Sequence, residues 1–119
     1  MESFNIPSIL VFDQVQDIRG NLCFLENSIN FPLKINNVSW VTDFKDFNTV
    51  NGYTYSSNKE IIINLTGICE LSIKDSLSNI TNYILNKPNT GIFIPFGYRR
   101  SIKNLSSDNL LIIISDKSY

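Results

Sequence analysis

The chain has 119 residues, of which 43% are hydrophobic and 12% aromatic, so it can bury one core of ordinary size. Ten basic and eleven acidic side chains give a formal net charge of −1, which argues against a nucleic-acid surface and a polybasic membrane-binding patch. No apolar run approaches the roughly 18 residues of a membrane span, and the first residues do not resemble a signal peptide. We therefore expect a single cytoplasmic domain over residues 1–119, with neither nucleic acid nor membrane as partner.

Short apolar segments follow one another along the whole chain, and Gly, Asn, Asp, Ser and Pro residues separate most of them. The predicted strands are Ile9–Phe12, Leu22–Leu25, Ile35–Val41, Glu60–Leu65, Ile68–Lys74, Ile80–Leu85, Ile92–Pro95, Tyr98–Lys103 and Leu110–Ser115. Isoleucine occurs 18 times, asparagine 16 times and alanine not at all, a composition that disfavours helices. The sequence predicts an all-β sandwich or small barrel.

The pattern within single segments predicts which of their faces are buried. In Ile68–Lys74, apolar and polar residues alternate, as in an antiparallel strand with one buried face. Ile61–Ile63 and Leu110–Ile114 are apolar on both sides, so both of their faces should be covered, either by a second layer of this chain or by a partner subunit. Cys23 and Cys69 lie far apart in apolar segments, and we expect two reduced thiols.

The chain contains no histidine, so the commonest general acid or base near neutral pH and the commonest metal ligand are both missing. Tyr53-x-Tyr55, then four residues, Glu60, then six residues and Gly67 form a spacing that resembles the first cupin motif. Cupins have histidines at the two tyrosine positions. The resemblance implies a cupin-type double-stranded β-helix, which is a jelly-roll barrel.

The segment from Pro95 to Asn104 resembles the second cupin motif, P-x-G-x-x-H-x-x-x-N, with Arg100 at the histidine position. A guanidinium cannot ligate a divalent cation, so we expect neither a metal nor another cofactor. If Arg100 and Glu60 both point into the barrel they should pair, because an unpaired buried charge costs several kcal/mol. The alternative is that Arg100 points to solvent.

Short motifs along almost the whole chain resemble the WxcM-like family of sugar-nucleotide 3,4-ketoisomerases. They are Asp17-Ile18-Arg19-Gly20-Asn21-Leu22, Phe31-Pro32-Leu33-Lys34-Ile35, Asn51-Gly52-Tyr53-Thr54-Tyr55 and Gly91-Ile92-Phe93-Ile94-Pro95. The third of these falls where the family has R-G-x-H-A-H. In that family, which acts on dTDP-4-keto-6-deoxyglucose, two histidines move the protons with help from a tyrosine and an arginine. The resemblance assigns the histidine roles to Tyr53 and Tyr55, the tyrosine role to Trp40 and the arginine role to Val50 or Asn51.

Tyrosine differs chemically from the histidine that it would replace. With a pKa of roughly 10 it is protonated at pH 7, so it can donate a proton but is a poor base. The catalytic candidates are therefore Tyr53, Tyr55 and the carboxylate of Glu60. The resemblance implies a pocket for a nucleotide-diphosphate sugar, most simply a dTDP-sugar. The candidate binding residues are Arg19, Trp40, Tyr53, Tyr55, Tyr98, Arg99 and Arg100.

These observations favour a sugar-nucleotide-binding cupin that lacks the histidine-based isomerase activity. One alternative is an active ketoisomerase or epimerase that uses tyrosine, glutamate and arginine. Another is a non-catalytic interaction module whose barrel is filled by its own side chains. The resemblance also implies a homodimer that exchanges N-terminal strands, which would give the Ile9–Phe12 segment a partner.

Overall fold

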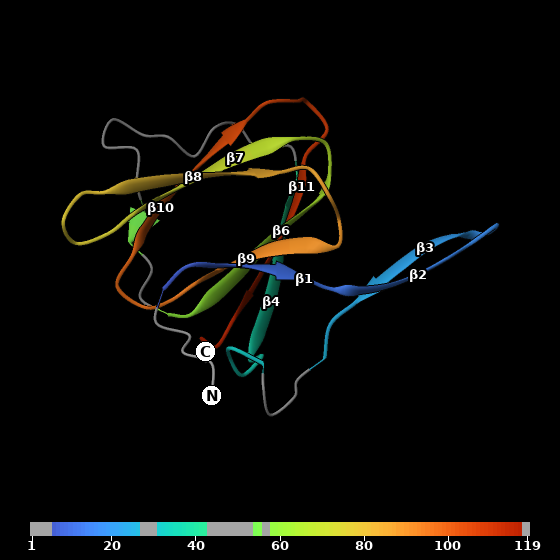
Figure 1. Cartoon of the computed structure of the whole chain (residues 1–119), viewed down its shortest axis with the longest axis horizontal. Coiled ribbons are helices and arrows are strands. Elements are labelled where there is room, and N and C mark those ends of the chain that lie inside the picture. Colours follow the sequence, from blue (N-terminus) through green and yellow to red (C-terminus); the bar gives the residue numbers. More distant parts are fainter. Residues whose placement is uncertain (1–5, 27–30, 43–53, 56–57, 118–119) are drawn as a thin grey trace.

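The computed structural model describes residues 6–26, 31–42, 54–55 and 58–117, which form β-strands and no helix (Figure 1). The strands are β1 (Ser8–Val11), β2 (Asp13–Asp17), β3 (Gly20–Phe24), β4 (Asn37–Thr42), β5 (Thr54–Tyr55), β6 (Glu60–Thr66), β7 (Cys69–Lys74), β8 (Ile80–Leu85), β9 (Thr90–Ile94), β10 (Arg99–Asn104) and β11 (Leu110–Ser115). The all-β prediction is confirmed. The described residues accordingly contain no helix that could span a membrane.

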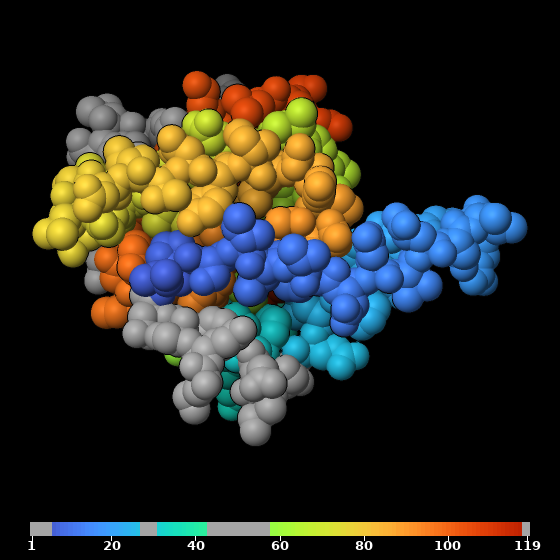
Figure 2. Space-filling model, in the orientation of Figure 1, coloured from blue at the N-terminus to red at the C-terminus, as the bar shows by residue number. Residues whose placement is uncertain are grey.

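Two antiparallel sheets form the body of the molecule. One has the strand order β1-β9-β6-β11-β4 and the other β5-β10-β7-β8. Their inner faces meet across a shared hydrophobic core, which confirms the jelly-roll barrel expected from the cupin motifs. Strands β2 and β3 form a separate hairpin that projects from the body (Figures 1 and 2).

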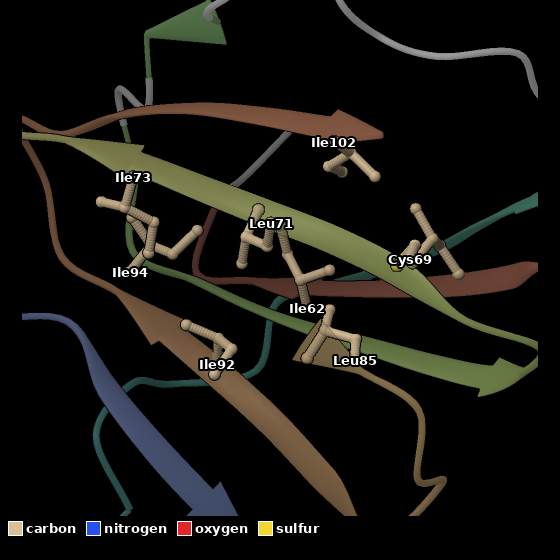
Figure 3. Close-up of a cluster of buried hydrophobic side chains, with 9 residues drawn as sticks. Ile62, Cys69, Leu71, Ile73, Leu85, Ile92, Ile94 and Ile102 are labelled. Carbon is tan, nitrogen blue, oxygen red and sulfur yellow. The ribbon is translucent and has the colours of Figure 1, made fainter. Parts of the chain in front are cut away.

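Aliphatic side chains from both sheets fill the space between them (Figure 3). The buried members are Ile62, Cys69, Leu71, Ile73, Leu85, Ile92, Ile94, Ile102 and Leu111. The alternation predicted for β7 is confirmed, since its three core residues are buried and the residues between them are half-buried. Burial raises the pKa of the Cys69 thiol to about 11, which keeps it in the unreactive protonated form.

A second core lies on the outer face of the five-stranded sheet. It contains Ile61, Ile63, Phe93, Ile114 and Leu33, and further apolar residues of the chain pack against it. Both faces of the Ile61–Ile63 segment are therefore covered from within this chain. β1 pairs antiparallel with β9 of the same chain, while its residues Ile9 and Val11 are 60% and 73% exposed.

The turn between β6 and β7 encloses Gly67 in a polar cluster. Gly67 has a φ of +77°, which favours glycine, and a Cβ added there would lie 2.4 Å from Ser106 Oγ and 2.6 Å from Asp108 Oδ1 and Asn109 Oδ1. Asn109 also accepts a 2.8 Å hydrogen bond from the Nδ2 of buried Asn64. The turn thus ties the start of β11 to the end of β6.

We expect Gly67→Ala to be distinctly more destabilising than Gly97→Ala. Both residues have positive φ, but nothing lies within 4 Å of a Cβ added at Gly97. The Gly97 variant should lose only the conformational cost of about 1–2 kcal/mol, whereas the Gly67 variant must also displace the cluster. Urea unfolding of both variants measures the difference, and equal losses would contradict the cluster's role.

Candidate functional site

Glu60 and Arg100 form an ion pair inside one end of the barrel. Arg100 Nε donates to Glu60 Oε2 over 2.8 Å, and Arg100 Nη2 donates to Oε1 over 3.3 Å. The side chains are only 13% and 15% exposed for Arg100 and Glu60, respectively. Arg100 therefore points inward, as one of the two sequence-based expectations required, and the solvent-facing alternative is wrong.

Strand alternation explains why these two side chains meet. Glu60 precedes the core residue Ile62 by two positions on β6, and Arg100 precedes the core residue Ile102 by two positions on β10. Each therefore faces the space between the sheets, and the pair links the five-stranded sheet to the four-stranded one. Both carboxylate oxygens already accept hydrogen bonds from a cation, so this site does not suit a divalent metal.

A pocket of about 280 Å³ opens at the same end of the barrel. Ile73, the ladder partner of Arg100, contributes to its wall. The complete lining is Ile6, Pro7, Ile73, Asp75, Asn79, Thr81, Tyr83 and Tyr98. The volume lies just below the ~300–1,000 Å³ usual for small-molecule sites and suits a single sugar ring. Tyr98 was predicted as a binding residue, and it lies in this wall.

Sequence reasoning did not identify Asp75 as a site residue, because the segment 75–79 has the composition of an ordinary turn. Its carboxylate accepts hydrogen bonds from the backbone N–H groups of Asn79 and Leu77 and from the Asn79 side chain. Of these, the backbone bond from Asn79 contributes most to lowering the pKa of Asp75, so the wall carries a negative charge at neutral pH. Such a wall disfavours a phosphate group at this position.

Arg19 and Trp40 do not reach this pocket within one chain. Arg19 lies at the tip of the projecting hairpin, where Nη2 pairs with Asp17 Oδ2 over 2.7 Å and the side chain is 85% exposed. Trp40 lies on β4, opposite Ile112 of β11, on the outer side of the five-stranded sheet. It is 67% exposed. Neither residue contacts the interior ion pair in this chain.

The predicted tyrosines are placed only in part. Tyr53 lies outside the described residues, as do Val50 and Asn51. In the ladder between β5 and β10, Tyr55 stands opposite the exposed Arg99, and Thr54 stands opposite Arg100. Thr54, and not the predicted Tyr55, is therefore the ladder partner of Arg100.

Comparisons with known proteins agree with this architecture. The family model described as WxcM-like, C-terminal (FdtA) matches residues 6–119. TDP-4-oxo-6-deoxy-α-D-glucose-3,4-oxoisomerase of Aneurinibacillus thermoaerophilus is 22% identical over 111 residues, which cover 93% of this chain and 79% of that protein.

Two solved structures share the fold. The TDP-quinovose 3,4-ketoisomerase WlaRB of Campylobacter jejuni is 27% identical with a TM-score of 0.82, covering 98% of this chain and 88% of that one. A mutant of the 3,4-ketoisomerase QdtA of Thermoanaerobacterium thermosaccharolyticum, in complex with TDP-4-keto-6-deoxyglucose, is 20% identical with a TM-score of 0.83. The match covers 98% of this chain and 84% of that one.

The fold and the two motif regions define a cupin of the kind found in sugar-nucleotide-modifying enzymes. Within that class, the match over residues 6–119 shows that the chain belongs to the WxcM-like family. QdtA has been solved in complex with TDP as well as with TDP-4-keto-6-deoxyglucose.

We expect Arg100→Met to destabilise the fold by about 1–3 kcal/mol, because it leaves the largely buried Glu60 carboxylate unpaired. Adding Glu60→Gln should recover part of this loss, since the double variant buries no unpaired charge. Chemical denaturation of the single and double variants gives the coupling energy. Arg19→Met, which removes the exposed pair, is the control and should change stability little. Strictly additive losses at positions 60 and 100 would contradict the interaction.

Proposed function

We propose that this protein binds a TDP-linked sugar at the end of its barrel and does not carry out the histidine-dependent isomerisation of its relatives. The observation that carries the proposal is the pairing of Arg100 with Glu60 beside the pocket, in a family whose neighbours bind TDP-sugars. The pocket offers the polar side chains of Asp75, Asn79 and Thr81 together with the aromatic walls of Tyr83 and Tyr98.

The chemistry of the chain supports binding without proton transfer. None of the 119 residues is histidine, so the acid and base of the related ketoisomerases have no direct equivalent. Glu60 is the remaining carboxylate candidate for a base, and both of its oxygens accept hydrogen bonds from Arg100. In the alternative, Tyr53, Tyr55 and Glu60 would act as the proton-transfer groups of a working isomerase or epimerase.

The pocket also bears on the third hypothesis, an interaction module with a filled barrel. The interior between the sheets is indeed filled by aliphatic side chains, but a cavity remains at the end that holds the ion pair. This remaining space supports a small-molecule ligand over a purely structural barrel. The free state of Cys23 and Cys69 supports a reducing compartment, and we place the protein in the cytoplasm on that basis.

We expect TDP to raise the thermal stability of the protein, and UDP and GDP to raise it less. A ligand at about 100 times its Kd stabilises the folded state by about 2.7 kcal/mol, which a thermal shift assay detects readily. Inorganic pyrophosphate at the same ionic strength is the control for general anion binding. If no nucleotide produced a shift, the proposal would be wrong and a search for a protein partner would follow.

A second assay separates binding from catalysis. The protein is incubated with TDP-4-keto-6-deoxyglucose in D₂O, and deuterium incorporation at C3 is followed by NMR. We expect no incorporation above the rate without protein, because the chain has no histidine and both oxygens of Glu60 accept hydrogen bonds from Arg100. Enzyme-dependent deuterium at C3 of the recovered 4-keto sugar would establish a working isomerase or epimerase instead, and deuterium at C4 of a 3-keto product would identify it as the isomerase.

We also propose a homodimer in which the β2–β3 hairpin of one chain packs on its partner. The hairpin projects from the body, and its directly opposed residues Val15 and Leu22 are both more than half exposed (Figure 1). Trp40 and Val38 on β4 form a second exposed apolar surface. An exchange of hairpins would cover apolar surface that a single chain leaves in water.

We expect the charge-introducing pair Val15→Lys and Leu22→Glu to convert this dimer to a monomer, because the new charges would be buried at the contact. The matched control is Gln16→Lys with Asn21→Glu, which puts the same charges on the other side of the hairpin. Light scattering with size-exclusion chromatography gives the mass of each. A monomeric unsubstituted chain, or equal dissociation of both variants, would refute this arrangement.

A further inference from the structure

The pocket at the end of the barrel has a wall of one charge sign. Among the eight described residues that line it, Asp75 is acidic and none is lysine or arginine. Lys74 and Arg99, which adjoin two of these residues in sequence, stand opposite each other in the β7–β10 ladder. Strand alternation turns both of them to the outer face of the sheet, because Ile73 and Arg100 face the interior. The wall is therefore negatively charged at neutral pH.

The turn between β7 and β8 fixes the Asp75 carboxylate in place. Oδ1 accepts 2.9 Å hydrogen bonds from the backbone N–H groups of Leu77 and Asn79, and Oδ2 accepts a 3.2 Å bond from Asn79 Nδ2. A carboxylate can accept about four hydrogen bonds, and these three donors are uncharged. The turn thus orders the carboxylate without neutralising it, so its charge acts on whatever enters the pocket.

Two aromatic rings complete the wall. Tyr83 lies on β8, opposite Leu71 of β7, and Tyr98 directly precedes β10. Both rings pack against the aliphatic core between the sheets. The face of such a ring attracts a cation, and it also offers an apolar surface to the C–H groups of a sugar. A positively charged sugar is therefore attracted by the carboxylate and by the rings, whereas a phosphate gains from neither.

We propose that the sugar held in this pocket carries a protonated amino group, which lies between the Asp75 carboxylate and the rings of Tyr83 and Tyr98. This inference rests on the proposed binding of a TDP-linked sugar, and it names the class of that sugar as an amino-deoxyhexose. A keto or hydroxyl group at the same place brings no charge to the carboxylate, so neutral sugars should bind more weakly. The diphosphate stays outside the negatively charged wall.

Ligands that differ in one group test the role of the charge on the unsubstituted protein. The amino sugars are TDP-4-amino-4,6-dideoxyglucose and TDP-3-amino-3,6-dideoxyglucose, and the neutral ligands are their N-acetyl derivatives and TDP-6-deoxyglucose. Calorimetry should show at least one amino sugar binding about tenfold more tightly than TDP-6-deoxyglucose, and its N-acetylation should abolish the gain. The gain should shrink at high salt, because ions screen the attraction.

Asp75→Asn tests the residue to which the amine is assigned. The amide oxygen can still accept the backbone hydrogen bonds of the turn, but the charge is gone. Affinity for the preferred amino sugar should fall about tenfold, to that of TDP-6-deoxyglucose, whose own affinity should not change. Glu70→Gln is the matched control, because it removes a carboxylate from the outer face of β7 and should change neither affinity. If Asp75→Asn did not fold, Asp75→Ser, whose hydroxyl can also cap the turn, would take its place.

The outcomes separate this inference from the function on which it rests. If the unsubstituted protein bound none of these TDP-sugars, the proposed function itself would be wrong. If it bound the amino sugars no more tightly than the neutral ones, only the amino-sugar inference would fall. A tighter amino sugar that Asp75→Asn and Glu70→Gln weakened equally, or not at all, would overturn Asp75 as the partner of the amine.

Discussion

A charge inside a small barrel must be compensated, and this constraint shapes the candidate site. Desolvation of Arg100 alone would cost several kcal/mol, and Glu60 is placed by strand alternation to offset that cost. The ion pair connects the first residue of β6, in one sheet, to the second residue of β10, in the other sheet. Aliphatic side chains fill most of the remaining interior, and buried Asn64, at the opposite end of β6, donates hydrogen bonds to Leu85 O and Asn109 Oδ1.

The strands that could be predicted from the sequence are those whose own pattern of apolar residues shows which faces are buried. In β7, the alternation of apolar and polar residues predicted one buried face. In β6, the continuous apolar run predicted two buried faces, and both predictions are confirmed. β2 was not predicted, because all its residues are exposed and only pairing with β3 makes it a strand. β5 has two residues, too few for any periodic signal.

The site was predictable only where motif spacing and strand alternation agree. Glu60 and Arg100 meet because each lies two residues before a core position, a relation that the sequence contains. Arg19 and Trp40 were chosen by order along the chain, which does not indicate that one sits on a projecting hairpin and the other on an outward face. Asp75 was missed since a carboxylate that stabilises a turn and one that lines a pocket have the same sequence signature.

Relative to the general cupin motif, position 100 carries arginine instead of histidine, and the resemblance places the two proton-moving histidines of the family at Tyr53 and Tyr55. Imidazole can take up and release a proton near neutral pH, whereas a guanidinium stays protonated and can only donate hydrogen bonds. With Arg100 present, both carboxylate oxygens of Glu60 accept hydrogen bonds from a guanidinium. Under the proposed function, the site keeps hydrogen-bonding groups that recognise a polar ligand, while the histidines that exchange protons in the family have no counterpart among the 119 residues.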